Sequence, residues 1–381
     1  MRRRAWATAA AALVMSATAL APPAASTTAS PGNLACAEAV VTKWSLPALA
    51  AETVVVPVDA SAILTMVPAA RDGFGGVILF GSNAPTTLAA SLGLVQAASA
   101  SGYALLVMTD EEGGGVWRLA NLVPAIPWAQ TMGRTLTPEQ ITALARRVGA
   151  TLVKLGVTVD LAPVLDVDAR AVAPGAGDPD GFRSFGGSPT VVAADGTAFL
   201  RGLTAASETG VVKHFPGLGG TTVNTDVGPA KTKPWSALQR TGLVPFKHAI
   251  ADGAPAVMLS NASVPGLTSL PASVSPAAVH ALRVSLGFTG LIVTDSLSAG
   301  ALSAIHLSVP QAAVAALRAG ADEVLFGVPA APATSLSLAL QVRAAIVSAV
   351  VHGSLARATL VAAAAEVLNV RHNLCATTST T

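Results

Sequence analysis

Eight short runs of β-branched and other apolar residues recur along this chain of 381 residues, separated by Ala- and Leu-rich helical stretches. This alternation constrains the fold most, because repeated strand–helix units favour a parallel sheet covered by helices. Eight units fit a closed (β/α)8 TIM barrel of the α/β class better than an open sheet. The runs are Thr53–Val58, Gly76–Phe80, Ala104–Met108, Thr158–Leu161, Val211–His214, Ala256–Leu259, Leu291–Thr294 and Glu323–Phe326.

The segments between the runs support one domain. With 52% hydrophobic residues, the chain can build one large core, and we find no linker or repeat. One or two Ala-rich helices are expected between residues 329 and 370, and the Gly- and Pro-rich segment 168–189 is typical of a functional loop. Helices are predicted over Leu88–Ala100, Pro138–Leu155, Val191–Glu208 and Pro310–Ala319.

The N-terminus has the pattern of a secretory signal peptide. Three arginines at positions 2–4 precede an apolar run from about Trp6 to Leu20, and small residues follow up to Ala25. We expect residues 1–25 to be a signal peptide, 26–45 a lead-in, 46–375 the barrel and 376–381 a disordered tail. The protein would then be secreted. A retained membrane anchor is the alternative, although the run is short for a span.

The net charge and the cysteines indicate which kinds of partner and which cellular compartment to expect. Without the three arginines the formal charge falls from +2 to about −1, and no basic cluster points to nucleic acid or anionic lipid. We expect a monomer. Cys36 and Cys375 lie near the two ends, and a disulfide between them is expected in an exported protein whose ends meet. The alternative for Cys36 is a lipid anchor.

Polar residues and glycines follow several of the predicted strands. They include the acidic Gly-rich segment 110–115, Asp166, the Lys213–His214 pair and Asp295. Strand C-termini are where barrel enzymes keep their chemistry, but open doubly wound sheets bind ligands there too. A carboxylate at the end of a buried strand is costly unless it reacts or is hydrogen-bonded, so Asp295 is either a nucleophile or a structural cap.

Four motifs resemble those of family 3 glycoside hydrolases, in the β-N-acetylglucosaminidase branch. Residues 212–219 (V-K-H-F-P-G-L-G) with 224–226 (N-T-D) resemble K-H-F-P-G-H-G…D-S-H. Residues 109–118 (T-D-E-E-G-G-G-V-W-R) are similar to D-Q-E-G-G-x-V-x-R, and 290–298 to G-x-x-x-[ST]-D-x-x-S. Residues 161–167 and 182–185 are similar to A-P-V-L-D-V…D-R-S-F. The motifs keep the family's order, so the chain is identified as a member.

The resemblance implies a role for each matching residue. Asp295 would be the nucleophile that forms a glycosyl-enzyme. Asp166 would brace the loop through backbone hydrogen bonds, and the glycines after Asp110 would let the backbone approach the sugar. The implied sugar-binding residues are Asp110, Arg118, Arg183, Lys213 and His214.

The chain departs from the family at the acid/base. There a histidine held by an aspartate does this work, but here the two positions carry Asp226 and Asn224. Leu218 and Phe182 replace a second histidine and a second aspartate. Retaining hydrolysis still needs a group that protonates the leaving oxygen and then activates water. Asp226 is our candidate, and we expect it to be partly buried near Asp295.

These residues predict a secreted retaining β-glycosidase, most simply an exo-β-N-acetylglucosaminidase acting on amino-sugar glycosides such as muropeptides. The substituted dyad leaves an inactive sugar-binding protein open. A β-glucosidase and a phosphorylase, whose phosphate could lessen the need for histidine, are further alternatives. No cofactor or metal is expected, because the six histidines show no metal-ligand spacing.

Overall fold

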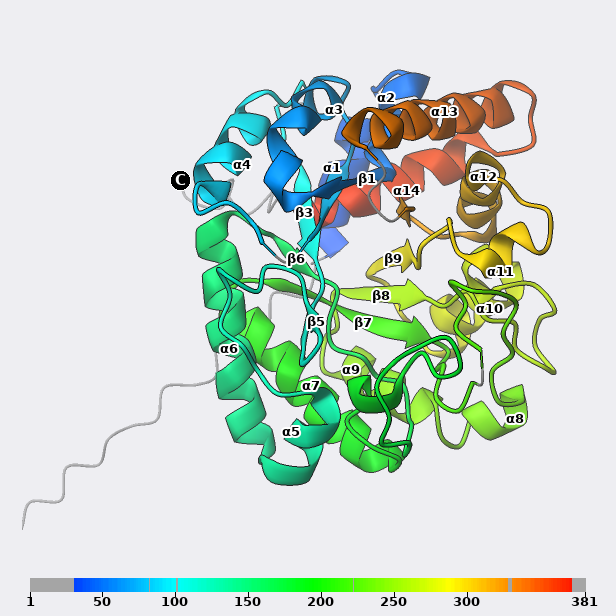
Figure 1. Ribbon diagram of the computed structural model, residues 1–381. Coiled ribbons are helices and arrows are strands. Elements are labelled where there is room, and N and C mark those ends of the chain that lie inside the picture. Colours follow the sequence, from blue (N-terminus) through cyan, green and yellow to red (C-terminus); the bar gives the residue numbers. More distant parts are fainter. Residues whose placement is uncertain (1–30, 82, 101, 222, 328–330, 372–381) are drawn as a thin grey trace, which may run out of the picture.

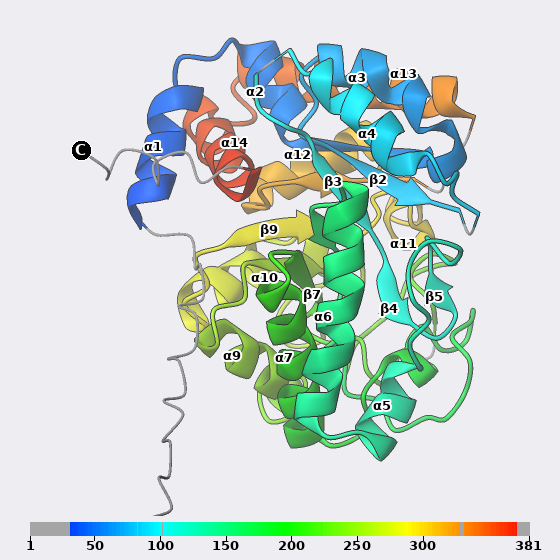
Figure 2. The same ribbon diagram turned by 90° about the vertical axis from the view of Figure 1, so that its left-hand side faces the viewer.

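A closed barrel of eight parallel strands forms the centre of the molecule. The computed structural model describes residues 31–371, except residues 82, 101, 222 and 328–330. The strands follow the order β10-β1-β2-β3-β6-β7-β8-β9, and a parallel bridge between Val293 and Glu323 joins the two ends of this series (Figures 1 and 2). They are β1 (Val54–Asp59), β2 (Gly76–Phe80), β3 (Leu106–Thr109), β6 (Val159–Asp160), β7 (Thr209–Phe215), β8 (Ala256–Leu259), β9 (Leu291–Thr294) and β10 (Val324–Leu325).

The barrel prediction is therefore confirmed, and each predicted apolar run overlaps a strand. Continuous apolar runs predict such strands because the strands of a parallel barrel are covered on both faces, so that successive residues are all apolar. β6 is shorter than its run because Pro163 soon follows, and proline has no N–H to extend the ladder.

Helices surround the barrel, and the predicted ones are present within a few residues. α6 begins with a capping box between Thr137 and Gln140 and ends at Gly156, whose φ of 86° suits a left-handed cap. The larger helices are α1 (Pro31–Val41), α2 (Leu46–Glu52), α4 (Leu88–Ala97), α6 (Pro138–Leu155), α7 (Pro189–Ala205), α9 (Leu243–Ala251), α12 (Val309–Ala319), α13 (Pro332–Val351) and α14 (Arg357–Arg371). The shorter ones are α3 (Val67–Arg71), α5 (Ala129–Thr135), α8 (Trp235–Leu238), α10 (Pro276–His280) and α11 (Gly300–Ser303).

The core has two parts. Inward side chains such as Ile78, Met108 and Val211 fill the barrel, and Val367 of α14 packs with them. A larger cluster lies between the strands and the helices. α13 is long and apolar enough to cross a membrane by composition, but it packs against α12, β1 and α2 in the outer layer.

Two features were not predicted. The acidic Gly-rich segment folds into an antiparallel hairpin, β4 (Glu111–Gly113) and β5 (Val116–Trp117). The lead-in contains α1, which packs against α14 and so brings the two ends of the described chain together. Cys36 lies on α1, whereas Cys375 is outside the described residues, so the disulfide stays a prediction. The expected signal peptide and tail also lie outside them.

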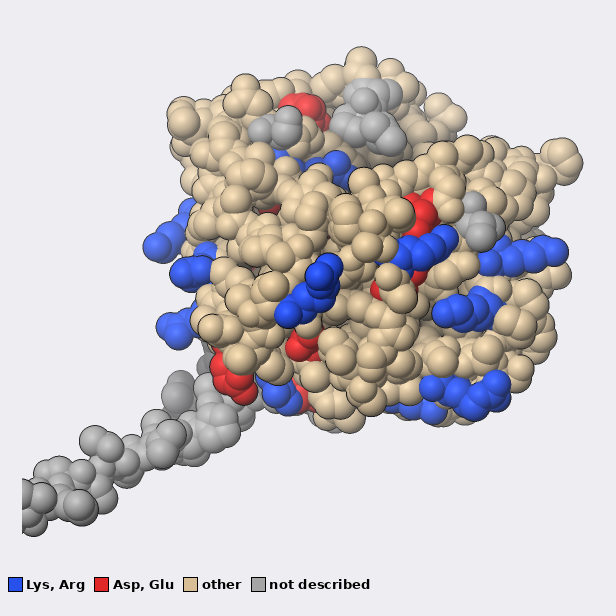
Figure 3. Space-filling view, turned by 60° about the horizontal axis from the view of Figure 1, so that its bottom comes forward, with Lys and Arg blue, Asp and Glu red and all other residues tan. Residues whose placement is uncertain are grey.

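On the face shown in Figure 3, basic side chains are spread over the surface singly or in small groups, with acidic ones between them. Most of this face is neither basic nor acidic. The distribution is that of an ordinary solvated surface and not of an electrostatic binding face.

Candidate active site

A cavity of about 300 Å³ lies at the C-terminal end of the barrel strands. Its lining includes every catalytic or sugar-binding residue that the sequence singled out: Asp110, Arg118, Arg183, Lys213, His214, Asp226 and Asp295. The fold thus gathers these residues in one place.

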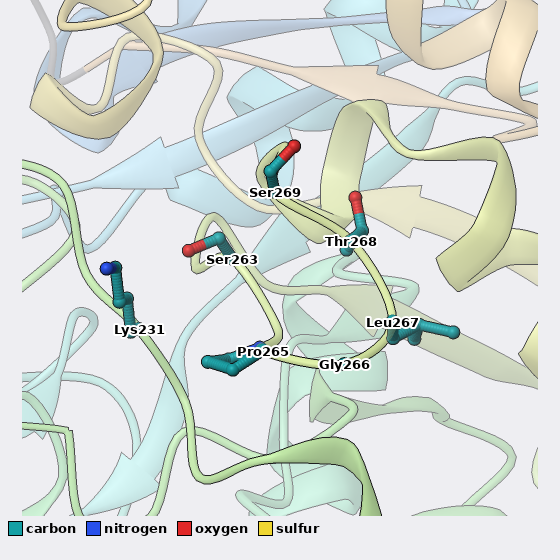
Figure 4. A pocket seen from close by; sticks show the side chains of 7 residues that line it. All are labelled: Lys231, Ser263, Pro265, Gly266, Leu267, Thr268 and Ser269. Carbon is teal, nitrogen blue, oxygen red and sulfur yellow. The ribbon is translucent and has the colours of Figure 1, made fainter.

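A second hollow, of about 440 Å³, lies in the loop after β8 beside Lys231. Figure 4 shows that its polar groups diverge: the Ser263 hydroxyl points toward Lys231, whereas those of Thr268 and Ser269 point away. This hollow holds none of the candidate carboxylates, so we place the active site in the cavity at the strand ends.

Two acids and two bases form a buried network on one wall of the cavity. The Nζ of Lys213 lies 2.7 Å from Oδ1 of Asp110 and 2.6 Å from Oε1 of Glu112. The Arg183 guanidinium donates two hydrogen bonds of 2.8 Å to the Glu112 carboxylate. Burial alone would raise the pKa of Glu112, but Arg183 and Lys213 outweigh it and hold that pKa below its ordinary value. The two negative charges of Asp110 and Glu112 are therefore balanced by the two positive charges of Lys213 and Arg183.

Asp110 is the member of this network that can receive a sugar. Burial opposes its ionisation, but Lys213 and Arg118 together lower the pKa of Asp110. The β4–β5 hairpin brings Arg118 back to within 3.6 Å of the Asp110 carboxylate, and its guanidinium lies 5.5 Å from the ring centre of Phe80. An ionised carboxylate beside a held guanidinium can bind neighbouring hydroxyl groups.

The glycines of the hairpin have a packing role that the sequence did not predict. A Cβ added to Gly114 would lie 1.9 Å from the Trp128 ring, and one on Gly115 would lie 2.8 Å from it. These glycines therefore make room for Trp128, and their expected approach to a sugar stays a prediction.

His214 is fixed by Asp166. Its Nδ1 lies 2.7 Å from Oδ2 of Asp166, and the other oxygen of Asp166 accepts hydrogen bonds from the backbone N–H groups of His214 and Leu218. The expected backbone bracing by Asp166 is thus present. Burial, and then the nearby Arg183, lower the pKa of His214 to about 4, so the ring is neutral near pH 7. If Nδ1 carries the proton, Nε2 is the acceptor of the ring, and an Arg183 nitrogen lies 3.4 Å from it.

Asp295 follows the end of β9 and lines the cavity. Its Oδ1 accepts a hydrogen bond of 2.7 Å from the backbone N–H of Ser296. Burial raises the pKa of Asp295 above its ordinary value; His214 lowers it, and the negative charge of Asp226 raises it further. The two aspartates that the sequence selected are therefore close enough to influence each other.

Asp226 is exposed, and the expectation of partial burial is wrong. The side chain of Asn224 accepts the Asp226 backbone N–H at 2.9 Å, which turns the chain outward at this point. Asn224 thus supports the Asp226 backbone, whereas the family's aspartate holds a histidine ring.

One group of described residues has the donor types of a metal site. Single donor atoms of Asp166, Asp180 and His214 all lie within 4.8 Å of one another. However, both oxygens of Asp166 already accept hydrogen bonds, and an Arg183 nitrogen lies 3.4 Å from Nε2 of His214. A guanidinium at this distance disfavours a divalent cation.

Residues 63–370 match the family model of the glycosyl hydrolase family 3 N-terminal domain. The chain belongs to glycosyl hydrolase family 3. β-Hexosaminidase LpqI of Mycobacterium tuberculosis is 37% identical over 258 residues, a match that covers 66% of each chain. An uncharacterized secreted glycosyl hydrolase of Arthroderma benhamiae is 33% identical over 264 residues, covering 66% of this chain and 72% of that one.

Solved structures of similar proteins have the same fold as this chain. The structure of M. tuberculosis LpqI has a TM-score of 0.79 and 32% identity, covering 88% of this chain and 96% of that one. The β-N-acetylhexosaminidase from Beutenbergia cavernae has a TM-score of 0.77 and 33% identity, covering 86% and 99%. Family membership makes this chain a glycoside hydrolase, as the sequence motifs predicted.

Sequence reasoning missed two side chains of the site. Glu112 pairs with both bases, yet its neighbour Glu111 looks the same in the sequence, and only the hairpin decides which one faces Arg183. Asp180 lies in the segment flagged as a functional loop, and its burial next to Asp166 had no local signal.

Proposed function

We propose that this glycoside hydrolase is an exported, retaining exo-β-N-acetylglucosaminidase with Asp295 as the nucleophile and Asp226 as the acid/base. The observation that carries this proposal is that both carboxyl groups line one cavity and are electrostatically linked, next to the charge-balanced wall of Lys213 and Arg183. A retaining glycosidase needs two carboxyl groups of this kind across the scissile bond.

In the first step, the Asp295 carboxylate attacks the anomeric carbon while the bond to the leaving oxygen breaks. Asp226 gives its proton to that oxygen. In the second step, the Asp226 carboxylate takes a proton from water, the resulting hydroxide attacks the anomeric carbon, and the bond to Asp295 breaks. The exposure of Asp226 suits the second step, because incoming water can reach it directly.

The other site residues hold the sugar. Asp110 accepts hydrogen bonds from hydroxyl groups, Lys213, Arg118 and Arg183 supply positive charge, and neutral His214 can accept a hydroxyl proton at Nε2. The amino-sugar preference is proposed because relatives are named β-hexosaminidases. Export is proposed from the signal pattern at residues 1–25 and from a relative called secreted. Muropeptides are the natural amino-sugar glycosides such an enzyme would meet.

The test uses the mature chain with an aryl β-N-acetylglucosaminide and an aryl β-glucoside. We expect faster turnover of the amino sugar, release of the β-anomer first by NMR, and no stimulation by phosphate. Asp295→Asn should abolish turnover, whereas Asp72→Asn, an exposed change just before β2 and thus at the opposite end of the barrel, should not.

The role of Asp226 has its own test. Asp226→Ala should remove activity on a poor leaving group far more than on an activated aryl group, because only the poor one needs a proton. An equal loss on both would exclude Asp226 as the acid. No turnover of either sugar by the unmodified chain would instead favour a sugar-binding protein.

A further inference from the structure

Asp180 is a buried acid that the proposed mechanism does not use. It is fully buried, and neither of its carboxyl oxygens has a hydrogen-bond partner among the described residues. The backbone fixes its position, since the Asp178 side chain accepts hydrogen bonds from the N–H groups of Asp180 and Gly181 at 3.1 and 3.0 Å. A buried ionised carboxylate without partners is strongly unfavourable.

The charge of the nearby Arg183 does not satisfy the buried Asp180 carboxyl group. Arg183 lies close by, but its guanidinium already donates two hydrogen bonds to Glu112 and one, of 2.8 Å, to the carbonyl of Pro179. The polar neighbour that remains is Asp166, which is also fully buried. Donor atoms of Asp166, Asp180 and His214 lie within 4.8 Å of one another, and two carboxyl groups this close do not both ionise.

We infer that Asp180 is a positioning residue that shares one proton with Asp166, and that this pair sets the tautomer of His214. With the proton on Asp180, its O–H points to Asp166, and the pair carries a single negative charge. Asp166 then stays able to accept the Nδ1–H of His214, which leaves Nε2 as an acceptor for the Arg183 nitrogen 3.4 Å away or for a sugar hydroxyl. The effect on turnover rests on the proposed function, whereas the effect on the histidine does not.

The charges around the pair agree with this assignment. Burial, and then the charge of Asp166, raise the pKa of Asp180 well above its ordinary value. Arg183 acts in the opposite direction, and the charge of Arg170 also interacts with Asp180. Lys213 and Asp295 are further charged groups that influence His214. A shared proton thus relieves the repulsion between the two buried carboxyl groups. A metal ion could do the same elsewhere, but here the positive charge of Arg183 disfavours one.

The experiment compares Asp180→Asn with Asp180→Ala. The amide of Asn can donate to Asp166 at every pH, so this variant should keep kcat/KM within about threefold. Ala leaves Asp166 without its donor and should raise KM for the amino sugar at least tenfold with a smaller effect on kcat. Thermal unfolding of both variants checks the fold.

Nitrogen-15 NMR of the histidine rings gives a readout that does not depend on activity, with His214→Ala identifying the signals. In the unmodified chain we expect Nδ1 protonated and Nε2 bare near pH 7, and a further change of these signals at alkaline pH when the pair loses its proton. Asp180→Asn should remove that alkaline change. If Asp180→Ala does not fold, this comparison still decides.

Three results would overturn the inference. The first is that the His214 signals titrate in the same way in the unmodified chain and in Asp180→Asn, and the second is that Asp180→Asn loses as much kcat/KM as a folded Asp180→Ala. The third is one bound zinc ion per chain whose removal changes the His214 signals. Absence of turnover in the unmodified chain would count against the proposed function, and the NMR result would stand apart from it.

Discussion

At the scale of single residues, the reactivity of Asp295 depends on its surroundings. Burial raises the pKa of Asp295 most, Asp226 adds to this effect, and His214 opposes it. A nucleophilic carboxylate reacts only when ionised, so kcat/KM should fall as the pH drops through this raised pKa. The acid limb of the pH profile therefore reports on the charge of Asp226.

We predict that Asp226→Asn moves this acid limb to lower pH. Removing the negative charge removes a repulsion that raises the pKa of Asp295, so Asp295 ionises at lower pH. The profile of kcat/KM should be measured with an activated aryl glycoside, which does not need the acid. Asp252→Asn, which alters an acid paired with Arg201 on the surface, is the control. A limb that stays in place or moves upward would contradict the prediction.

The identity of the site residues was more predictable than their surroundings. Asp295, Lys213 and His214 could be named because strand ends and motif letters mark them. The exposure of Asp226 could not, because it depends on how one Asx turn directs the chain. The proton-sharing partner of Asp166 could not either, because Asp180 is fourteen positions away in an irregular loop and only packing brings them together.

At the scale of elements, the loop that carries Asp226 is held from two sides. On one side, the loop over residues 168–180 makes two hydrogen bonds to it. The Arg170 side chain donates to the carbonyl of Thr221 at 2.7 Å, and the carbonyl of Ala176 accepts from the N–H of Asn224 at 2.8 Å. On the other side, the N–H of Gly300 at the start of α11 donates to the Asp226 carbonyl at 3.0 Å. The position of the Asp226 carboxyl group thus depends on both elements.

Gly300→Ala should therefore lower activity without unfolding the protein. An added Cβ would lie 2.7 Å from the backbone of Val227 and 2.9 Å from the carbonyl oxygen of Asp226, so the loop must shift. A displacement of about 1 Å can cost on the order of 100-fold in rate, and we expect a loss of kcat of about 10- to 100-fold.

Gly228→Ala is the matched control, because a Cβ there has no atom within 4 Å. It lies in the same loop and should keep nearly full activity. If both variants are equally active, the position of the Asp226 loop does not limit the reaction.

Element prediction succeeded where one pattern persisted over several residues. The strands and the long helices have such patterns, and their bounds agree within a few residues. The β4–β5 hairpin spans only the seven residues from Glu111 to Trp117, and its register depends on glycines fitted around Trp128. The local sequence of the hairpin does not reveal its contact with Trp128, which lies outside the hairpin.

At the scale of the whole molecule, α14 completes the barrel. Val367 packs with the barrel interior, and Arg371 forms an ion pair with Glu52 at the end of α2. The Arg371 guanidinium also donates to the carbonyls of Tyr103 and Ala104. Both side chains of the pair are almost completely buried, at 1% and 0% exposed. The C-terminal helix is thus joined to the first helices and to the loop before β3.

Arg371→Met should destabilise the fold strongly, because it leaves a buried charge without its partner. Removing one member of such a pair typically costs about 3–5 kcal/mol of unfolding free energy. Burial already raises the pKa of Glu52, and only Arg371 lowers it. Without Arg371 the pKa of Glu52 rises further, and a raised acid pKa means that stability is lost as the pH increases. Urea unfolding should show a larger loss at pH 8 than at pH 5.

Arg357→Met on the same helix separates this effect from a general loss of arginine. Among the described residues, Arg357 donates to the carbonyls of Thr42 and Trp44 in an exposed setting, so its replacement should cost less than about 1 kcal/mol and show no such pH dependence. Equal losses for the two variants would mean that α14 is held by its apolar face alone. A loss at position 371 that is the same at both pH values would mean that Glu52 finds another cation.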